Sequence, residues 1–129
     1  MSNVRKEIET IDANKTLTAD DSGKVFMVGH ATVPFAITLP APTTAGLIFK
    51  FIYINDATAV TITSTAANIF GVLSVESATN RIACASKLSV LFAADALIGD
   101  SLEFISNGVN YYVTGLGANS ASFTTATIP

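Results

Sequence analysis

Few side chains in this 129-residue sequence have the types and spacing that catalysis requires. The only imidazole, His30, lies between two glycine- and proline-containing turns, and no carboxylate, cysteine or second histidine close by in the sequence could make it a general base. Ser86, Ser89 and Ser101 do not lie in the Gly-x-Ser-x-Gly pattern of a nucleophile elbow. Cys84 is the only cysteine and has aliphatic neighbours, so we expect a buried, unreactive thiol.

The acidic residues raise two further possibilities, and their spacing favours neither. Asp20-Asp21-Ser22-Gly23 resembles the start of a calcium loop, but no carboxylate follows before Asp56, and calcium takes about six to eight oxygens. We therefore expect a tight turn with Gly23 at positive φ. A glycosidase needs two carboxylates flanking one bond, and the remaining candidates are scattered: Glu76, Asp95, Asp100 and Glu103. The sequence thus predicts a protein that is not an enzyme and has no metal or cofactor.

Three tyrosines are the remaining candidates for a binding site. Tyr53, Tyr111 and Tyr112 could form a platform on which a sugar ring stacks. Aromatic side chains at strand spacing more often pack in a core or an interface, and we favour that interpretation.

Charge is distributed unevenly along the chain. Of seven basic and ten acidic residues, nine lie in Met1–Lys24 and eight in all that follows. Charged residues make up 13% of the sequence, whereas an average soluble domain has about a quarter. Such a surface is easiest to keep soluble when other protein covers much of it. The composition therefore predicts a symmetric oligomer or a subunit of a larger shell.

The composition also argues against several classes of partner. The net charge is −3 and the only adjacent basic pair is Arg5–Lys6, so we expect no nucleic-acid binding. The longest apolar run, Gly46–Ile54, has about half the length of a membrane-spanning helix and contains Lys50, so we expect no membrane insertion. The N-terminus lacks the hydrophobic segment of a signal peptide, which favours assembly in the cytoplasm.

Thr, Val, Ile, Phe and Tyr dominate the sequence, and turn residues recur at short intervals. This pattern predicts an all-β fold, an antiparallel β-sandwich or jelly-roll-like barrel with short N- and C-terminal arms. We assign residues 1–14 to an N-terminal arm, 15–117 to the sandwich domain and 118–129 to a C-terminal tail, and we find no internal repeat. The expected strands are Lys24–Val28, Phe35–Leu39, Gly46–Ile54, Thr58–Thr63, Asn68–Val75, Lys87–Phe92, Leu102–Ser106 and Val109–Thr114.

Four local features refine this expectation. Gly46–Ile54 is apolar on both faces apart from one lysine, so both faces should be covered. Gly71 inside a strand predicts a bulge or bend, and Asn107-Gly108 predicts a type I′ hairpin turn. Lys87–Phe92 also fits a helical face; we favour a strand, with a short turn of helix through Ala93–Ile98.

The order of these segments resembles the small capsid decoration (cement) proteins of tailed bacteriophages and related β-domains of phage head fibres. The resemblance covers about four fifths of the chain. Its stretches are TLTADDSGKVFMV (Thr16–Val28), ITLPAP (Ile37–Pro42), GLIFKFIYIN (Gly46–Asn55), VTIT (Val60–Thr63), NIFG (Asn68–Gly71) and GDSLEFISNGVNYYVTG (Gly99–Gly115). Related sequences often carry a tryptophan after the last hairpin turn, where this chain has Tyr111-Tyr112.

The resemblance implies a structural virion protein that binds the capsid exterior as a homotrimer, with the major capsid protein as partner, and stabilises the contacts between capsomers. The alternative is a fibre or tail-associated domain that binds a host surface glycan. The candidate capsid or subunit interface comprises apolar residues of the arm, the two-faced strand and the tail: Val4, Ile8, Ile11, Phe51, Tyr53 and Phe123.

Overall fold

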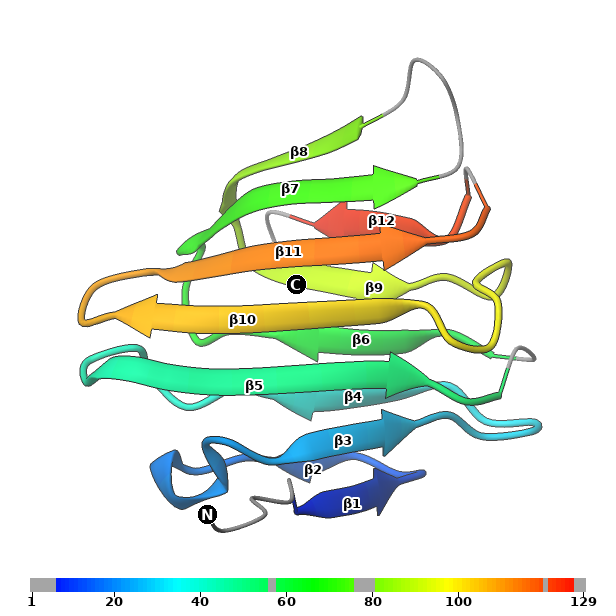
Figure 1. The fold of residues 1–129 in the computed structure, drawn as a ribbon, viewed down its shortest axis with the longest axis horizontal. Coiled ribbons are helices and arrows are strands. Elements are labelled where there is room, and N and C mark those ends of the chain that lie inside the picture. Colours follow the sequence, from blue (N-terminus) through cyan, green and yellow to red (C-terminus); the bar gives the residue numbers. More distant parts are fainter. Residues whose placement is uncertain (1–6, 56–57, 76–80, 120, 127–129) are drawn as a thin grey trace, which may run out of the picture.

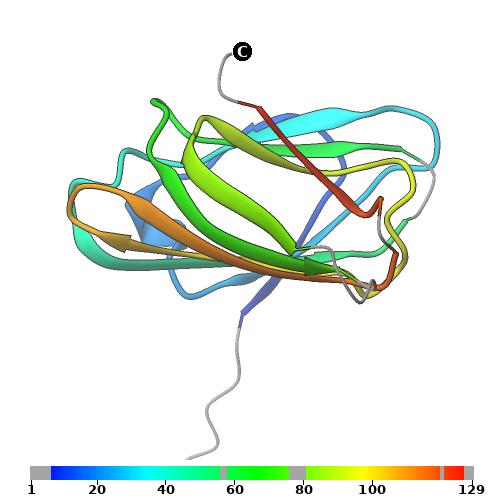
Figure 2. The ribbon, with the colours of Figure 1, turned by 90° about the horizontal axis from the view of Figure 1, so that it is seen from above.

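In the computed structural model, described over residues 7–55, 58–75, 81–119 and 121–126, two β-sheets face each other and no α-helix occurs (Figures 1 and 2). The large sheet contains, in spatial order, β1 (Ile8–Ile11), β3 (Val25–Val28), β5 (Ala45–Tyr53), β10 (Ser101–Asn107), β11 (Tyr111–Gly117), β7 (Ile69–Val75) and β8 (Arg81–Lys87). The small sheet contains β12 (Phe123–Ala126), β9 (Ser89–Phe92), β6 (Val60–Thr63), β4 (Phe35–Thr38) and β2 (Lys15–Thr16). The all-β prediction is confirmed, in a sandwich-like arrangement.

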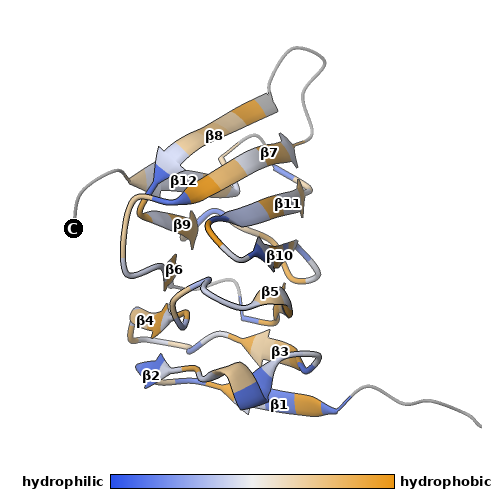
Figure 3. Cartoon of the chain, turned by 90° about the vertical axis from the view of Figure 1, so that its left-hand side faces the viewer, coloured by the Kyte–Doolittle hydropathy of each residue, from blue (hydrophilic) through white to orange (hydrophobic). Residues whose placement is uncertain are grey.

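The expectation of purely antiparallel sheets is wrong, because both sheets are mixed. In the large sheet β1, β3 and β5 run parallel, and in the small sheet so do β2, β4 and β6. From β1 to β6 the chain coils, and each pass adds one strand to each sheet (Figure 3). The turns between these strands carry the chain across to the other sheet, which is the crossover that parallel neighbours require.

This coil contains an internal repeat that the sequence did not reveal. Val25 pairs with Lys50 and Phe35 pairs with Val60, so residues 25–38 and 50–63 are equivalent positions of successive passes. What the two passes share is the alternation of inward and outward residues rather than residue identity, so the repeat is weak in the sequence alone.

The last hairpin forms where it was expected, but its turn lies one residue later. The backbone N–H of Asn107 donates to the carbonyl of Asn110 (3.1 Å), which makes Gly108 and Val109 the central residues. Gly108 alone has a positive φ in this turn, as in a type II′ rather than a type I′ turn. The Asn107 side-chain oxygen fixes the turn by accepting hydrogen bonds from the backbone N–H groups of Val109 and Asn110.

Gly71 lies at a β-bulge, as predicted. Ile69 pairs with Lys87 and Gly71 pairs with Cys84, so β8 has one extra residue at this point. Ser86 in the bulged segment has φ 53°, and among the described residues it is the only non-glycine with positive φ. The expected strand Lys87–Phe92 divides here between the end of β8 and β9, and a single turn follows at 93–96 in place of a helix.

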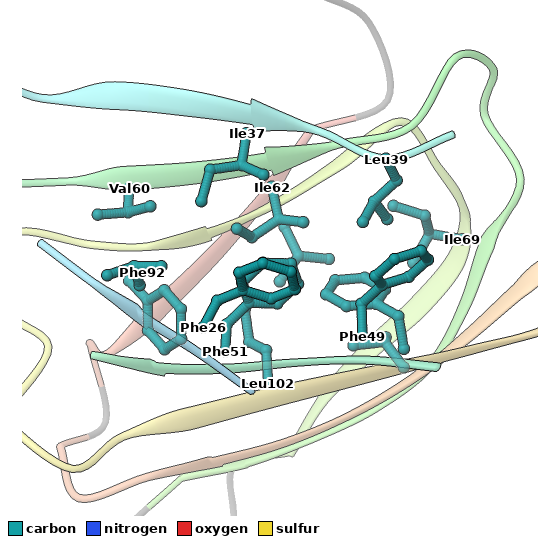
Figure 4. Close-up of a cluster of buried hydrophobic side chains, with 14 of the residues drawn as sticks. Phe26, Ile37, Leu39, Phe49, Phe51, Val60, Ile62, Ile69, Phe92 and Leu102 are labelled. Carbon is teal, nitrogen blue, oxygen red and sulfur yellow. The ribbon is translucent and has the colours of Figure 1, made fainter. Parts of the chain in front are cut away.

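The core fills the space between the sheets (Figure 4). The Phe51 ring stacks on Phe26, with ring centroids 5.4 Å apart, and meets Phe104 edge-on at 5.9 Å. The Tyr111 hydroxyl, brought into the same core by β11, donates to the carbonyl of Pro40 at 2.5 Å. Every second residue of β5 points into this core: Leu47, Phe49, Phe51 and Tyr53.

Both expected arms contribute strands to the sandwich, so its limits differ from residues 15 and 117. Ile8–Ile11 pairs with β3, and Phe123–Ala126 pairs with β9. Each segment places an apolar residue in the core, Ile11 in the first and Phe123 in the second. Burial of these residues, rather than an extended arm, accounts for their apolar character.

The charges near the N-terminus hold its strand in place. The Lys24 ammonium group lies 2.9 Å from Asp21, 3.2 Å from Glu9 and 3.4 Å from Glu7, and Lys15 pairs with Glu9. The bond from Lys15 lowers the pKa of the Glu9 carboxyl, as does the bond from Lys24. Strongly hydrophilic residues accordingly lie around β1 and β2 (Figure 3).

Candidate functional site

The described residues contain no cluster of three or more His, Cys, Asp or Glu side chains that could hold a metal ion. His30 has a local structural role: its Nδ1 accepts hydrogen bonds from the backbone N–H groups of Thr32 and Val33, both at 3.0 Å. Cys84 is buried as predicted, and burial raises the pKa of its thiol. Asp100 is 3% exposed and accepts backbone hydrogen bonds from Leu97 and Ala118, so it organises two loops.

The Asp-Asp-Ser-Gly segment forms the tight turn that was predicted. Residues Ala19–Asp21 make one turn of 3-10 helix, and Gly23 has φ +90°. An Asp21 carboxylate oxygen accepts the backbone N–H of Thr18 at 3.0 Å. This bond, with the one from Lys24, lowers the pKa of Asp21. Both Asp21 oxygens are therefore engaged in holding the turn.

The notable surface is the outer face of the large sheet, which we call the large-sheet face. The strand registers arrange its side chains in three rows across the sheet. The rows are Thr10, Met27, Ile52, Ser101, Leu116 and Ser74; Ile8, Val25, Lys50, Glu103, Thr114, Val72 and Ala83; and Ile48, Ile105, Tyr112 and Phe70. Lys50 and Glu103 are the charged residues at the centre of these rows, and in register Arg81 of β8 pairs with Ser74 at the edge of the sheet.

Several apolar residues of the large-sheet face are strongly exposed. Leu116 is 67% exposed, Ile8 59% and Ile105 45%, and Ile48 and Val72 are also exposed. Six strand spacings of about 4.8 Å and three rows give a footprint on the order of 600 Å² once side chains at the margin are included. Serine, threonine and charged residues occupy part of this footprint, and the apolar remainder still reaches the few hundred Å² that commonly mark an interaction site.

A shallow groove continues this face at one end of the sandwich. Its volume is about 510 Å³, and its lining is largely apolar. Leu116 and Ser74 belong both to the groove and to the large-sheet face, and Ile98, which also lines the groove, is 64% exposed. The groove therefore extends the apolar surface around the edge of the sandwich.

The outer face of the small sheet, which we call the small-sheet face, has a different composition. One row across it contains Thr16, Thr38, Thr63, Ser89 and Ala126, and the next contains Ala36, Thr61, Leu91 and Thr124. These rows carry no charge and only one large apolar side chain. The two outer faces of one sandwich thus differ: threonine covers the small-sheet face, and aliphatic and aromatic side chains cover the large-sheet face.

Only one of the residues predicted for an interface lies on the large-sheet face. Ile8 is exposed there, whereas Ile11, Phe51, Tyr53 and Phe123 are buried in the core, where they cannot contact a partner. Val4 lies outside the described residues.

The alternation within β5 contained the information needed to choose between its two apolar faces. Lys50 must reach solvent, so Ile48 and Ile52, which share its side of the strand, are the outward residues. The expectation that both faces are covered holds within the chain only for the inner face, because Ile48 remains exposed.

The three tyrosines do not form a common platform. Tyr53 and Tyr111 are fully buried in the core, and Tyr112 is 41% exposed on the large-sheet face. Tyr112 packs near Phe70 from the neighbouring strand, with ring centroids 6.3 Å apart. The structural basis suggested for sugar stacking is therefore absent.

The described part of the chain has no helix of the length and hydropathy needed to cross a bilayer. No protein-family model matches the chain, and no curated protein matches its sequence.

Proposed function

We propose that this protein is a structural component of a phage particle, a decoration protein that binds the capsid exterior as a trimer and stabilises capsomer contacts. The observation that carries the proposal is the large-sheet face, a broad and largely apolar surface with one pair of charged residues, Lys50 and Glu103, at its centre. The resemblance of the sequence to decoration proteins supplies the assembly in which such a surface is covered, a trimer bound to the major capsid protein of a shell.

The physical requirements of decoration agree with the architecture. A decoration protein acts by burying area across a seam between shell subunits, and non-covalent area suffices for this. The aromatic core and the two cross-connected sheets provide a rigid body on which such a contact surface is held. No reactive side chain is needed for this function.

The direct test is reconstitution. The purified protein is mixed with expanded, undecorated heads assembled from the shell protein of the phage that encodes it. We expect saturable binding in cosedimentation, density at three-fold positions in cryo-electron microscopy, and heads that rupture at a higher temperature. Heads that stay bare at tens of micromolar folded protein would refute the proposal.

A glycan array is the matching test of the fibre interpretation. Without a tyrosine platform we expect no glycan binding, and specific binding by a protein that is absent from heads would support the fibre role instead.

A further inference from the structure

The centre of the large-sheet face carries two opposite charges side by side. Lys50 on β5 and Glu103 on β10 are direct cross-strand partners, and these strands are third and fourth in the seven-stranded sheet. Glu103 is exposed and Lys50 is half-buried. Among the described residues neither Lys50 nor Glu103 takes part in an ion pair, unlike Lys15 and Lys24 in the N-terminal cluster.

Apolar residues surround these two charges on both sides. In the rows before and after them lie Ile48, Ile52, Ile105 and Tyr112. A partner that covers this surface removes both charges from water, and the attraction between Lys50 and Glu103 alone does not offset that cost unless opposite charges on the partner add to it. A partner that is apolar around the same kind of charge pair supplies those charges.

A second copy of this chain meets that requirement by symmetry. When copies surround an axis parallel to β5 and β10, each presents Lys50 toward one neighbour and Glu103 toward the other. We infer that three copies associate through their large-sheet faces about such an axis, with Glu103 of each copy facing Lys50 of the next. This inference rests on the proposed function for the number of copies, and it identifies the surface that holds the trimer together.

The arrangement explains both features of the face. The six charged groups around the axis alternate in sign, so they fix the register of the subunits, while the apolar rows supply the buried area. Each copy buries its whole face, part against each neighbour. The small-sheet face, which has no charges in its rows, stays outside the trimer and is available to the shell.

Charge reversal tests the inference. Lys50→Glu places six acidic groups around the axis and Glu103→Lys places six basic groups there, so each single change should weaken self-association at least about tenfold, since like charges repel. The double variant Lys50→Glu/Glu103→Lys restores alternation and should associate within about threefold of the unchanged protein. The matched control is Thr61→Glu on the small-sheet face, which should leave association unchanged.

Analytical ultracentrifugation at micromolar concentrations measures the oligomeric state, and circular dichroism shows that each variant is folded. An equimolar mixture of the two single variants should assemble less fully than the double variant, because in any mixed ring of three one seam joins like charges. A mixture that assembles as fully as the double variant would overturn the three-fold arrangement.

The inference would be overturned altogether if the protein without substitutions were a monomer, or if the single variants associated as tightly as it does. Head binding is measured separately: a trimer that ignores heads refutes only the proposed function, and a monomer that binds heads refutes only this inference.

Discussion

Substitution of Gly71 by alanine tests the packing that joins β7 to the large sheet. Gly71 has φ +143°, a conformation that costs an L-residue about 1–3 kcal/mol. A Cβ at this position would lie 2.0 Å from the carbonyl oxygen of Val113, which belongs to the backbone and cannot rotate away. β7 would have to move from β11, which weakens ladder hydrogen bonds worth about 1 kcal/mol each. We expect the backbone strain and the weakened hydrogen bonds together to lower the free energy of unfolding by about 3–5 kcal/mol.

Urea unfolding followed by circular dichroism measures this loss. Gly23→Ala is the matched control, because Gly23 also has a positive φ (+90°) but no atom within 4 Å of the place that an alanine methyl group would take. The free energy of unfolding of the control should fall only by the cost of a positive φ for alanine, about 1–2 kcal/mol. If Gly71→Ala loses no more than Gly23→Ala, the close approach of β7 to β11 does not exist as described. The account of Phe70 and Val72 as part of the large-sheet face would then fail as well.

Three further predictions concern buried and paired groups. Tyr111→Phe leaves the Pro40 carbonyl without its donor and should cost about 1–2 kcal/mol in urea unfolding; a change below about 0.5 kcal/mol would contradict this role. Burial raises the pKa of Tyr111 to about 12, so its phenolate absorption should appear well above pH 10. The pKa values of Glu9 and Asp21 in the folded protein lie below their ordinary values of 4.5 and 3.8. The two carboxylates therefore stabilise the fold fully above the ordinary values, and this contribution is lost as the pH falls through the lowered pKa values of the folded protein. Lys24→Gln should flatten this acid-induced fall in melting temperature, and an unchanged fall would show that the ion pairs do not stabilise the fold.

Local features of the fold could be predicted because each depends on a few neighbouring residues. Gly23 in its turn, the bulge at Gly71 and the two-faced strand at β5 all follow from backbone preference or alternation. The hairpin was predicted from Asn107-Gly108, and only its two central residues were placed one position too early. The Asn107 side-chain oxygen accepts hydrogen bonds from the backbone N–H groups of Val109 and Asn110, which moves the turn forward by one residue.

Strand pairing could not be predicted, because it depends on where each turn sends the chain. An antiparallel sandwich was expected, yet after Pro40 and its neighbours the chain crosses to the other sheet, and β4 lies parallel to β6. The interface residues were misplaced for a related reason. Phe51 and Tyr53 were chosen for size and apolar character, and those properties also suit a core.

The two passes of the coil show that the apolar character of the large-sheet face has a cause outside the isolated domain. Met27 and Ile52 are equivalent outward positions in the large sheet, and Thr38 and Thr63 are equivalent outward positions in the small sheet. All four residues point away from the core, so packing within the sandwich does not account for the difference between the two sheets. Threonine is well suited to an outward strand position in contact with water, whereas several aliphatic residues at such positions favour binding to another protein surface. The large-sheet face is therefore the one whose composition requires a cover, and its two central charges determine how that cover must be placed.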